Sequence, residues 1–201
     1  MCGAKDPRWS GTERPWNDPF RDVRASDWFY SGVKFAYQHG LFQGTAADMF
    51  SPDEPMTRAM LVTVLWRMDG KPSAAGGSSF TDVPRGQWYT EAVAWAAENG
   101  VVNGVGGGKF EPDGNVTREQ IATILYRYAG LRGVPTGGRA DLGSFPDGGA
   151  VSGWAYDALS WANAAGLIAG TREGGVDYLA PQQNATRAQV AVILMRYLGA
   201  A

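Results

Sequence analysis

Apolar residues recur at helical spacing along most of the chain, in stretches of two kinds. Stretches of the first kind begin at a tryptophan, and the stretch from Trp88 to Gly100 places its apolar side chains on one face of an α-helix. A glycine at the end of such a stripe is typical of a helix C-terminus, because glycine adopts the left-handed conformation that stops the helix. The three stripes of this kind are Trp28, Val33, Ala36 and Tyr37; Trp88, Ala92, Val93, Trp95 and Ala96; and Trp154, Ala158, Leu159, Trp161 and Ala162.

Stretches of the second kind begin at a threonine, after a glycine-rich loop. The pattern therefore predicts helix, loop and helix in each of three units. Neither helix of a unit can bury its apolar face alone, so we expect the units to pack against one another in an all-α fold. The clearest stripes of this second kind are Ile121, Ile124, Leu125 and Tyr128, and Val190, Ile193, Leu194 and Tyr197.

The three units are copies of one internal repeat. Each opens with an aromatic residue, an aspartate two positions later and then a tryptophan. Two glycines spaced by four follow, then an apolar-x-Pro segment, around which we expect only short extended pieces, and a Thr-Arg pair five residues after the proline. The predicted organisation is a poorly ordered leader at 1–19, helix-loop-helix repeats at 20–70, 80–130 and 145–199, and linkers at 71–79 and 131–144.

Composition excludes several classes of function. The 201 residues include 18 Lys and Arg against 20 Asp and Glu, and this balance argues against a nucleic-acid groove. One His and one Cys are too few for a zinc cluster or a disulfide framework, so we expect no metal and no cofactor. No apolar stretch approaches the roughly 20 residues of a membrane-spanning helix, so we expect no membrane insertion. Residues 1–19 lack the pattern of a signal peptide, and we expect any export signal to lie elsewhere on a longer parent chain.

An enzyme is also disfavoured. General acid–base catalysis needs one positioned pair of groups, whereas the acids of this chain recur with the repeat. The glycine-rich segment 104–109 has Phe110 after its lysine, where a phosphate-binding loop requires Ser or Thr. We therefore predict a non-catalytic protein.

The threonine that opens each second helix is a good N-cap, because its hydroxyl accepts a hydrogen bond from a free backbone N–H. Gln120 and Gln189 stand three residues after Thr117 and Thr186 and complete a capping box. Met60 occupies this position in the first repeat, which is expected to keep only the cap.

The arginine after each threonine stands at the first helical position, where the helix dipole disfavours a cation by roughly 0.3–1 kcal/mol. Two interpretations stay open. One is a salt bridge to an opening aspartate of a neighbouring repeat, and the other is an anion site in which the guanidinium and free backbone N–H groups bind a carboxylate or phosphate. The arginines are Arg58, Arg118 and Arg187, and the aspartates are Asp22, Asp82 and Asp147.

A second arginine lies near the end of each second helix, at Arg67, Arg127 and Arg196. The negative end of the dipole favours a cation there, so we expect these three residues to be structural. On this assignment, replacing Arg118 by alanine weakens ligand binding with helix content intact, whereas replacing Arg127 lowers thermal stability.

Tryptophans, aspartates and glycines complete the candidate binding site. The tryptophans at the predicted helix starts suit either the core or a groove wall, and the aspartates suit either a turn or a sugar hydroxyl. The candidate residues besides the three arginines are Trp28, Trp88 and Trp154; Asp22, Asp82 and Asp147; and the second glycine of each pair, Gly44, Gly104 and Gly170.

Together these motifs resemble the S-layer homology (SLH) domain family. The resemblance covers residues 20–199 and rests on Phe-x-Asp-Val, the tryptophan, the Gly-x-x-x-Gly turn, Phe-x-Pro and Thr-Arg-Ala, in the family's usual three tandem copies. The chain departs from the family in two places. The signature Thr-Arg-Ala-Glu reads Thr-Arg-Ala-Met, Thr-Arg-Glu-Gln and Thr-Arg-Ala-Gln, and Gly148 replaces the valine of Phe-x-Asp-Val.

The resemblance implies a pseudo-threefold, three-pronged helical body that anchors a protein outside the cell, in the Gram-positive wall or S-layer. It implies binding of secondary cell-wall polysaccharide, typically pyruvylated, in grooves between repeats, with the ketal carboxylate at the Thr-Arg arginine and sugar C–H groups against tryptophan. Cargo domains are expected on the longer parent chain. A protein–protein assembly module of an S-layer or surface complex stays open as the alternative.

Overall fold

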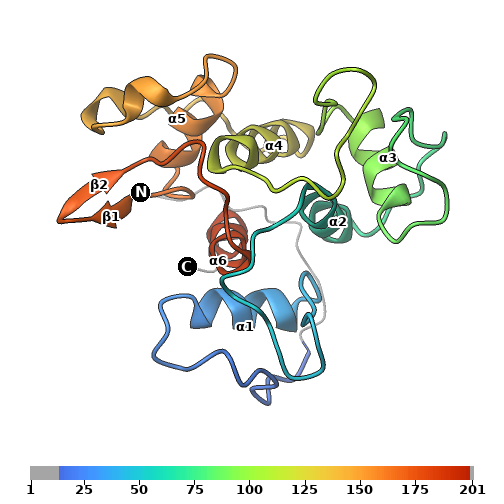
Figure 1. Ribbon diagram of the computed structural model, residues 1–201, viewed down its shortest axis with the longest axis horizontal. Coiled ribbons are helices and arrows are strands. Elements are labelled where there is room, and N and C mark those ends of the chain that lie inside the picture. Colours follow the sequence, from blue (N-terminus) through green and yellow to red (C-terminus); the bar gives the residue numbers. More distant parts are fainter. Residues whose placement is uncertain (1–13, 200–201) are drawn as a thin grey trace.

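The computed structural model describes residues 14–199. In this part of the chain, six α-helices are joined by long loops, with two 3₁₀ helices and one two-stranded sheet (Figure 1). The fold is therefore a mixture of helix and loop with a small β-hairpin. The predicted helices are present, but the all-α class does not describe the whole fold. The elements are α1 (Tyr30–Gln38), α2 (Arg58–Met68), α3 (Thr90–Glu98), α4 (Arg118–Leu131), η1 (Leu142–Ser144), η2 (Gly148–Ala150), α5 (Tyr156–Ala164), β1 (Thr171–Glu173), β2 (Val176–Tyr178) and α6 (Arg187–Tyr197).

The second helix of each repeat begins where the sequence predicts. Thr57, Thr117 and Thr186 are the N-caps of α2, α4 and α6, and each hydroxyl accepts the N–H three residues ahead. The capping box is complete in α4 and α6. Helix α2, with Met60 at the third helical position, has the cap alone, which confirms the expectation from sequence.

The first helix of each repeat begins two residues later than predicted. Helices α1, α3 and α5 start at Tyr30, Thr90 and Tyr156, and a turn precedes them: the N–H of Tyr30 donates to Asp27 O at 3.0 Å. This turn takes the tryptophan of each repeat out of the helix and onto the surface. The tryptophans therefore do not contribute to the helical stripes that they open in the sequence.

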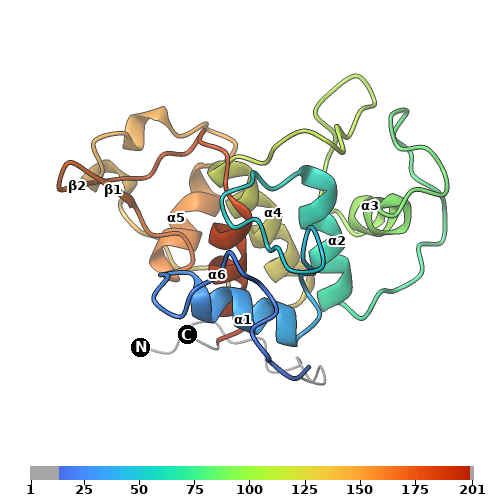
Figure 2. The ribbon, with the colours of Figure 1, turned by 60° about the horizontal axis from the view of Figure 1, so that its bottom comes forward.

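Each second helix packs against the first helix of the next repeat. The pairs in contact are α2 with α3, α4 with α5, and α6 with α1, so the last repeat closes onto the first. Figure 1 shows α2, α4 and α6 toward the middle of the molecule and α1, α3 and α5 outside them, and the turned view of Figure 2 keeps each pair side by side.

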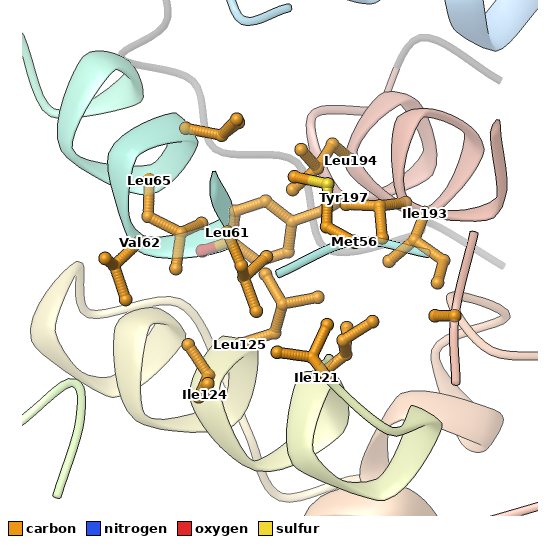
Figure 3. Close-up of a cluster of buried hydrophobic side chains, with 14 of the residues drawn as sticks. Met56, Leu61, Val62, Leu65, Ile121, Ile124, Leu125, Ile193, Leu194 and Tyr197 are labelled. Carbon is orange, nitrogen blue, oxygen red and sulfur yellow. The ribbon is translucent and has the colours of Figure 1, made fainter. Parts of the chain in front are cut away.

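Large aliphatic side chains from the three inner helices meet at the centre (Figure 3). Leu61 and Leu65 of α2, Leu125 of α4 and Leu194 of α6 are fully buried. Burial of each such side chain stabilises the fold by about 1.5–3 kcal/mol. This central cluster joins all three repeats, which confirms that the units bury their apolar faces against one another.

The strands form a hairpin in the middle loop of the third repeat, where the sequence has extra residues relative to the other two repeats. Strands β1 and β2 are antiparallel and pair Thr171 with Tyr178. Gly174 and Gly175 form the turn with φ of 57° and 85°, a pair of positive values typical of a tight two-residue hairpin. Strand β2 ends directly before the Leu179-Ala180-Pro181 segment, around which the sequence predicts short extended pieces, whereas the repeat pattern does not predict its pairing with β1.

The end of the leader is ordered against α1. Residues 1–13 lie outside the described part of the chain, so the expectation of disorder there is not addressed. From Arg14 onward the chain packs against the first repeat: the indole N–H of Trp16 donates to the hydroxyl of Tyr30 at 3.0 Å, and its ring meets Phe20 and Tyr37 edge-on. Residues 14–19 thus contact the first repeat, and the predicted poor order of the leader stays a prediction.

Helix α1 approaches α6 closely at Gly32. A Cβ added to Gly32 would lie 2.6 Å from Cγ2 and 2.9 Å from Cα of Val192. The corresponding positions of the other pairs carry Ala92 on α3 and Ala158 on α5. Glycine inside a helix costs roughly 0.5–1 kcal/mol relative to alanine, and close packing on α6 gives the reason for it here.

Replacing Gly32 by alanine is expected to lower the free energy of unfolding by about 1–2 kcal/mol, because overpacking outweighs the better helix propensity. Chemical denaturation monitored by circular dichroism measures this change. The matched control is Gly130 of α4, which has no atom within 4 Å of an added Cβ, and its replacement by alanine is expected to be neutral or stabilising. Equal effects of the two substitutions would contradict the close α1–α6 contact.

Candidate functional site

The opening aspartate of each repeat holds the apolar-x-Pro segment of the same repeat. The two carboxylate oxygens of Asp82 accept the N–H groups of Phe110 and Glu111, both at 2.8 Å. Asp22 binds Phe50 and Ser51 in the same way, and Asp147 binds Leu179 and Ala180, at 2.7–2.9 Å. These contacts support the turn-forming interpretation of the aspartates, whereas direct contact with a ligand stays a prediction.

The aspartate also compensates a strained backbone. The middle residue of each apolar-x-Pro segment has a left-handed conformation, with φ of 57° at Ser51, 57° at Glu111 and 49° at Ala180. None of these residues is glycine, so each conformation costs of order 1 kcal/mol or more. The carboxylate bonded to the N–H of that same residue stabilises it in this conformation.

Replacing Asp82 by asparagine is expected to lower stability by about 1–2 kcal/mol near neutral pH. Burial raises the pKa of Asp82, but the N–H groups of Phe110 and Glu111 lower it further, so the net pKa lies below its ordinary value. The ionised carboxylate therefore adds stability above the pKa of the unfolded chain, and this contribution disappears as the pH falls through the folded-state pKa. Denaturation curves of wild type and variant should converge below about pH 4 and separate above it; parallel curves across this range would contradict the role of the charge.

The Thr-Arg arginine of each repeat binds backbone carbonyls of the following repeat. Arg118 donates from Nε to Leu179 O at 2.8 Å and from Nη2 to Ala169 O at 2.6 Å. The same two nitrogens of Arg58 bind Phe110 and Asn103 at 2.7 and 3.3 Å, and those of Arg187 bind Phe50 and Gln43 at 2.9 and 2.8 Å. The direct partners are carbonyl oxygens, so the salt bridge to an aspartate is not formed.

Backbone contacts at the same junctions occupy the helix N-termini. The N–H of Arg58 donates to Gly114 O, that of Arg118 to Gln183 O and that of Arg187 to Glu54 O, at 2.9–3.0 Å. The next N–H of each helix also donates to a carbonyl of the neighbouring repeat. These N–H groups are therefore not free to bind an external anion, and the helix-start part of the expected anion site is absent from α2, α4 and α6.

Burial and local charge together explain why an arginine suits this position. Arg58, Arg118 and Arg187 are only 5–6% exposed. Burial lowers the pKa of Arg58, and the charges of Glu111 and Asp82 partly offset that effect. A guanidinium stays protonated in such a site, and the bound carbonyls supply the negative potential that opposes the helix dipole.

A cleft of about 400 Å³, which we call cleft A, lies beside Arg58 at the junction of all three repeats. Arg58 comes from the first repeat, Arg127 from the second and Trp154 from the third. One face of α4 forms much of the wall. The polar and aromatic residues that line cleft A are Arg58, Asn103, Gln120, Thr123, Arg127 and Trp154.

A smaller cleft of about 140 Å³, cleft B, lies at the junction beside Arg187. Its wall is the face of α2 that corresponds to the α4 face in cleft A, and Trp88 takes the place of Trp154. Its corresponding residues are Gln43, Met60, Thr63, Arg67, Trp88 and Arg187. In the described part of the chain, neither cleft lining includes a carboxylate, so both suit an anionic ligand.

The opening tryptophans are surface residues. Trp28, Trp88 and Trp154 are 66%, 56% and 59% exposed, which settles the choice between core and groove wall against the core. Trp88 and Trp154 line clefts B and A. Their exposed faces are suited to stacking on a sugar ring, and Trp28 has the same exposure at the third junction.

The second glycine of each pair fits closely under the opening aromatic residue of its repeat. A Cβ on Gly104 would lie 2.5 Å from Lys109 O and 2.9 Å from the ring of Phe80, and one on Gly44 would lie 2.5 Å from Ala46 O. Gly44 and Gly104 also line clefts B and A, whereas Gly170 is in contact with Phe145 and the hairpin. The close fit explains these glycines without a ligand, and their contact with one stays a prediction.

The arginines near the helix C-termini differ from one another. Arg67 donates to Leu41 O at 3.0 Å, and Arg196 donates to Gly166 and Leu167 at 3.5 and 3.4 Å, as expected of structural residues. Arg127 makes no hydrogen bond or ion pair within residues 14–199, and it lines cleft A. The sequence-based division between binding and structural arginines therefore does not hold for Arg127.

Sequence reasoning missed the wall of cleft A. Gln120, Thr123, Ile124 and Arg127 are spaced by three, one and three residues, which places them on one face of α4. That spacing was available as a signal. The capping box explains Gln120 and the negative end of the helix dipole explains Arg127, so neither residue needs a ligand to account for it.

Residues 14–199 contain no group of three or more His, Cys, Asp and Glu side chains arranged to hold a metal ion. Within the same residues, the helices are too short or too polar to span a bilayer.

Comparison with known families identifies the repeat. The sequence model described as the S-layer homology domain matches residues 19–59, 79–122 and 144–191. Each match begins one residue before the opening aromatic residue and runs through the Thr-Arg pair into the second helix.

Related proteins include enzymes and a surface-layer protein. An endoglucanase of Bacillus sp. (strain KSM-635) is 31% identical over 180 residues, which are 90% of this chain and 19% of the relative. The surface-layer 125 kDa protein of Lysinibacillus sphaericus is 32% identical over 173 residues (86% and 14%), and an amylopullulanase of Thermoanaerobacterium thermosulfurigenes is 25% identical over 175 residues (87% and 9%). The chain thus spans less than a fifth of each of these relatives, two of which are named as enzymes.

Proposed function

Because the chain belongs to the S-layer homology domain family, we propose that it is a non-catalytic module that anchors a longer protein to the bacterial cell wall. It works outside the cell and binds an anionic wall polysaccharide. The polysaccharide is the secondary cell-wall polymer, and the anionic group is the carboxylate of a pyruvate ketal. The endoglucanase and the surface-layer protein carry the matched segment as a small part of a longer chain, which supports an anchoring role.

The observation that supports this proposal most directly is the composition of clefts A and B. Each combines two arginines, an exposed tryptophan and polar side chains, without a carboxylate among its lining residues in the described chain. A sugar that carries a carboxylate needs a cation, an aromatic face for its C–H groups and hydrogen-bonding groups for its hydroxyls. Both clefts bring these groups together from three different repeats.

Modest affinity at one cleft is sufficient for an anchor. A hydrogen bond between a guanidinium and a carboxylate contributes about 1.5–3 kcal/mol. A polysaccharide presents the same group many times, so two or more clefts on one rigid body increase the overall affinity without any new contact. The recurring junctions support a pseudo-threefold, three-pronged body that holds the clefts at fixed separation.

Sedimentation with purified wall sacculi tests the proposal. We expect the chain to co-sediment with native Gram-positive walls, and to be lost from walls stripped of secondary polysaccharide by hydrofluoric acid. Replacing Trp88 and Trp154 together by alanine should reduce retention more than tenfold, since truncating a tryptophan that anchors a binding interface costs about 2 kcal/mol or more. Leu131, an exposed apolar residue outside both clefts, provides the control substitution by alanine.

Each other outcome of this experiment rejects one specific part of the proposed function. Equal retention on stripped walls rejects polysaccharide binding, and equal retention on depyruvylated walls rejects the carboxylate as the recognised group. Reversible self-association of the chain without any wall retention favours the protein–protein assembly module instead.

A further inference from the structure

We infer that the three junctions are not equivalent and that cleft A is the principal site for the anionic sugar, with Arg127 as the residue that binds its carboxylate. This inference rests on the proposed function. It extends that function because the repeats occupy corresponding positions but carry different side chains at each junction.

Among the three arginines near the ends of α2, α4 and α6, Arg127 differs from Arg67 and Arg196 in the described chain. It is half-buried on the α4 face that walls cleft A and has no hydrogen bond or ion pair within the described chain. Its counterparts are committed to carbonyl oxygens, Arg67 to Leu41 and Arg196 to Gly166 and Leu167. Arg127 can therefore form a bidentate pair with a carboxylate without losing an internal bond.

The volumes and lining residues of the two clefts also favour cleft A as the principal site. Cleft A has a volume of about 400 Å³, within the range of about 300–1,000 Å³ usual for small-molecule sites, whereas cleft B has about 140 Å³. Gln120 stands in cleft A where Met60 stands in cleft B. The side-chain oxygen of Gln120 accepts the N–H of Thr117, which leaves its amide nitrogen to donate to a sugar hydroxyl.

The third junction keeps a glutamine, Gln189, at the helix position of Gln120, but another side chain of its α6 wall differs. Val192 on α6 occupies the position of Thr123 in cleft A and Thr63 in cleft B, so a hydroxyl is replaced by a methyl group. Helix α1 packs directly on Val192 through Gly32. The wall of the third junction therefore has an apolar side chain where the walls of clefts A and B have a threonine.

Cleft A also has a fixed aromatic wall. The buried carboxylate of Glu119 accepts the N–H of Ser152 at 3.0 Å and its hydroxyl at 2.9 Å, two residues before Trp154. The other two repeats have Ala59 and Ala188 in place of Glu119 and cannot make this contact. Glu119 is thus a positioning residue for Trp154, and a preorganised wall lowers the entropic cost of binding.

Calorimetry with a synthetic probe tests the assignment. The probe is the methyl glycoside of an N-acetylhexosamine with a 4,6-pyruvate ketal, compared with the methyl ester of the same ketal. We expect Arg127→Gln to weaken binding of the acid by about tenfold or more and to change binding of the ester less than twofold. Arg85→Gln, an exposed charge change outside both clefts, is the matched control and should leave both affinities unchanged.

The same substitution at Arg67 and at Arg196 tests whether cleft A or another junction is the principal site. A larger loss of acid binding from Arg67→Gln or Arg196→Gln than from Arg127→Gln would overturn the inference and leave the proposed function standing. Failure of the wild-type chain to bind either the probe or native walls would reject both.

The role of Glu119 has its own readout. With 5-fluorotryptophan in the chain and the Trp154 signal assigned from Trp154→Phe, Glu119→Ala should shift that ¹⁹F resonance and weaken binding of acid and ester by the same factor. Glu119→Gln keeps an acceptor for Ser152 and should restore part of the affinity. An unchanged Trp154 resonance in Glu119→Ala, or a loss confined to the acid, would overturn the positioning role.

Discussion

Replacing Arg118 by alanine is expected to lower the free energy of unfolding by about 3–5 kcal/mol, with a fall in Tm of roughly 10 °C. Arg118 is 5% exposed, and its guanidinium joins the second repeat to Leu179 O and Ala169 O of the third. Removing it leaves two carbonyls without their charged donor and opens a void at the junction. Differential scanning calorimetry of the whole chain measures the change.

The matched control lies on the same helix. Replacing Arg127 by alanine removes the same group from α4 but breaks no internal hydrogen bond, so stability should change by no more than about 0.5 kcal/mol. This order is the reverse of the one that the sequence predicts, in which Arg118 binds the ligand and Arg127 stabilises the fold. A stable Arg118→Ala protein beside a strongly destabilised Arg127→Ala protein would restore the sequence-based assignment.

Replacing Gly148 by valine, which restores the Phe-x-Asp-Val motif in the third repeat, is expected to destabilise the protein by about 3 kcal/mol. A Cβ at position 148 would overlap the carbonyl oxygen of Leu142 and would lie 2.8 Å from its carbonyl carbon. Leu142 is fully buried in η1, so the backbone has no room to withdraw. The departure from the family motif is therefore a consequence of how the linker 131–144 crosses the third repeat.

The neighbouring glycine provides the comparison. Gly149 is exposed and has no atom within 4 Å of an added Cβ, so its replacement by alanine should leave the denaturation midpoint nearly unchanged. Urea denaturation of both variants measures the difference. A Gly148→Val protein as stable as the wild type would show that η1 does not pack against this position.

The sequence predicted the repeats, the second-helix caps and the helix-ending glycines because these features depend on residues a few positions apart. Thr117 and Gln120 bond to each other across three residues, and Gly100, with φ of 66°, ends the α3 segment within one turn. The family resemblance was equally accessible, since its motifs are short and stand at fixed offsets. The first-helix starts were missed by two residues because a turn, and not a helix, carries each tryptophan.

Tertiary structure alone decided what the arginines and tryptophans do. Arg187 binds carbonyls that lie 137 and 144 residues away in the sequence, and cleft A takes Arg58, Arg127 and Trp154 from three different repeats. An apolar stripe shows that a helix is covered, but it does not show which helix covers it. The docking of each second helix on the next repeat determines which polar groups are buried against carbonyls and which remain free beside a cleft.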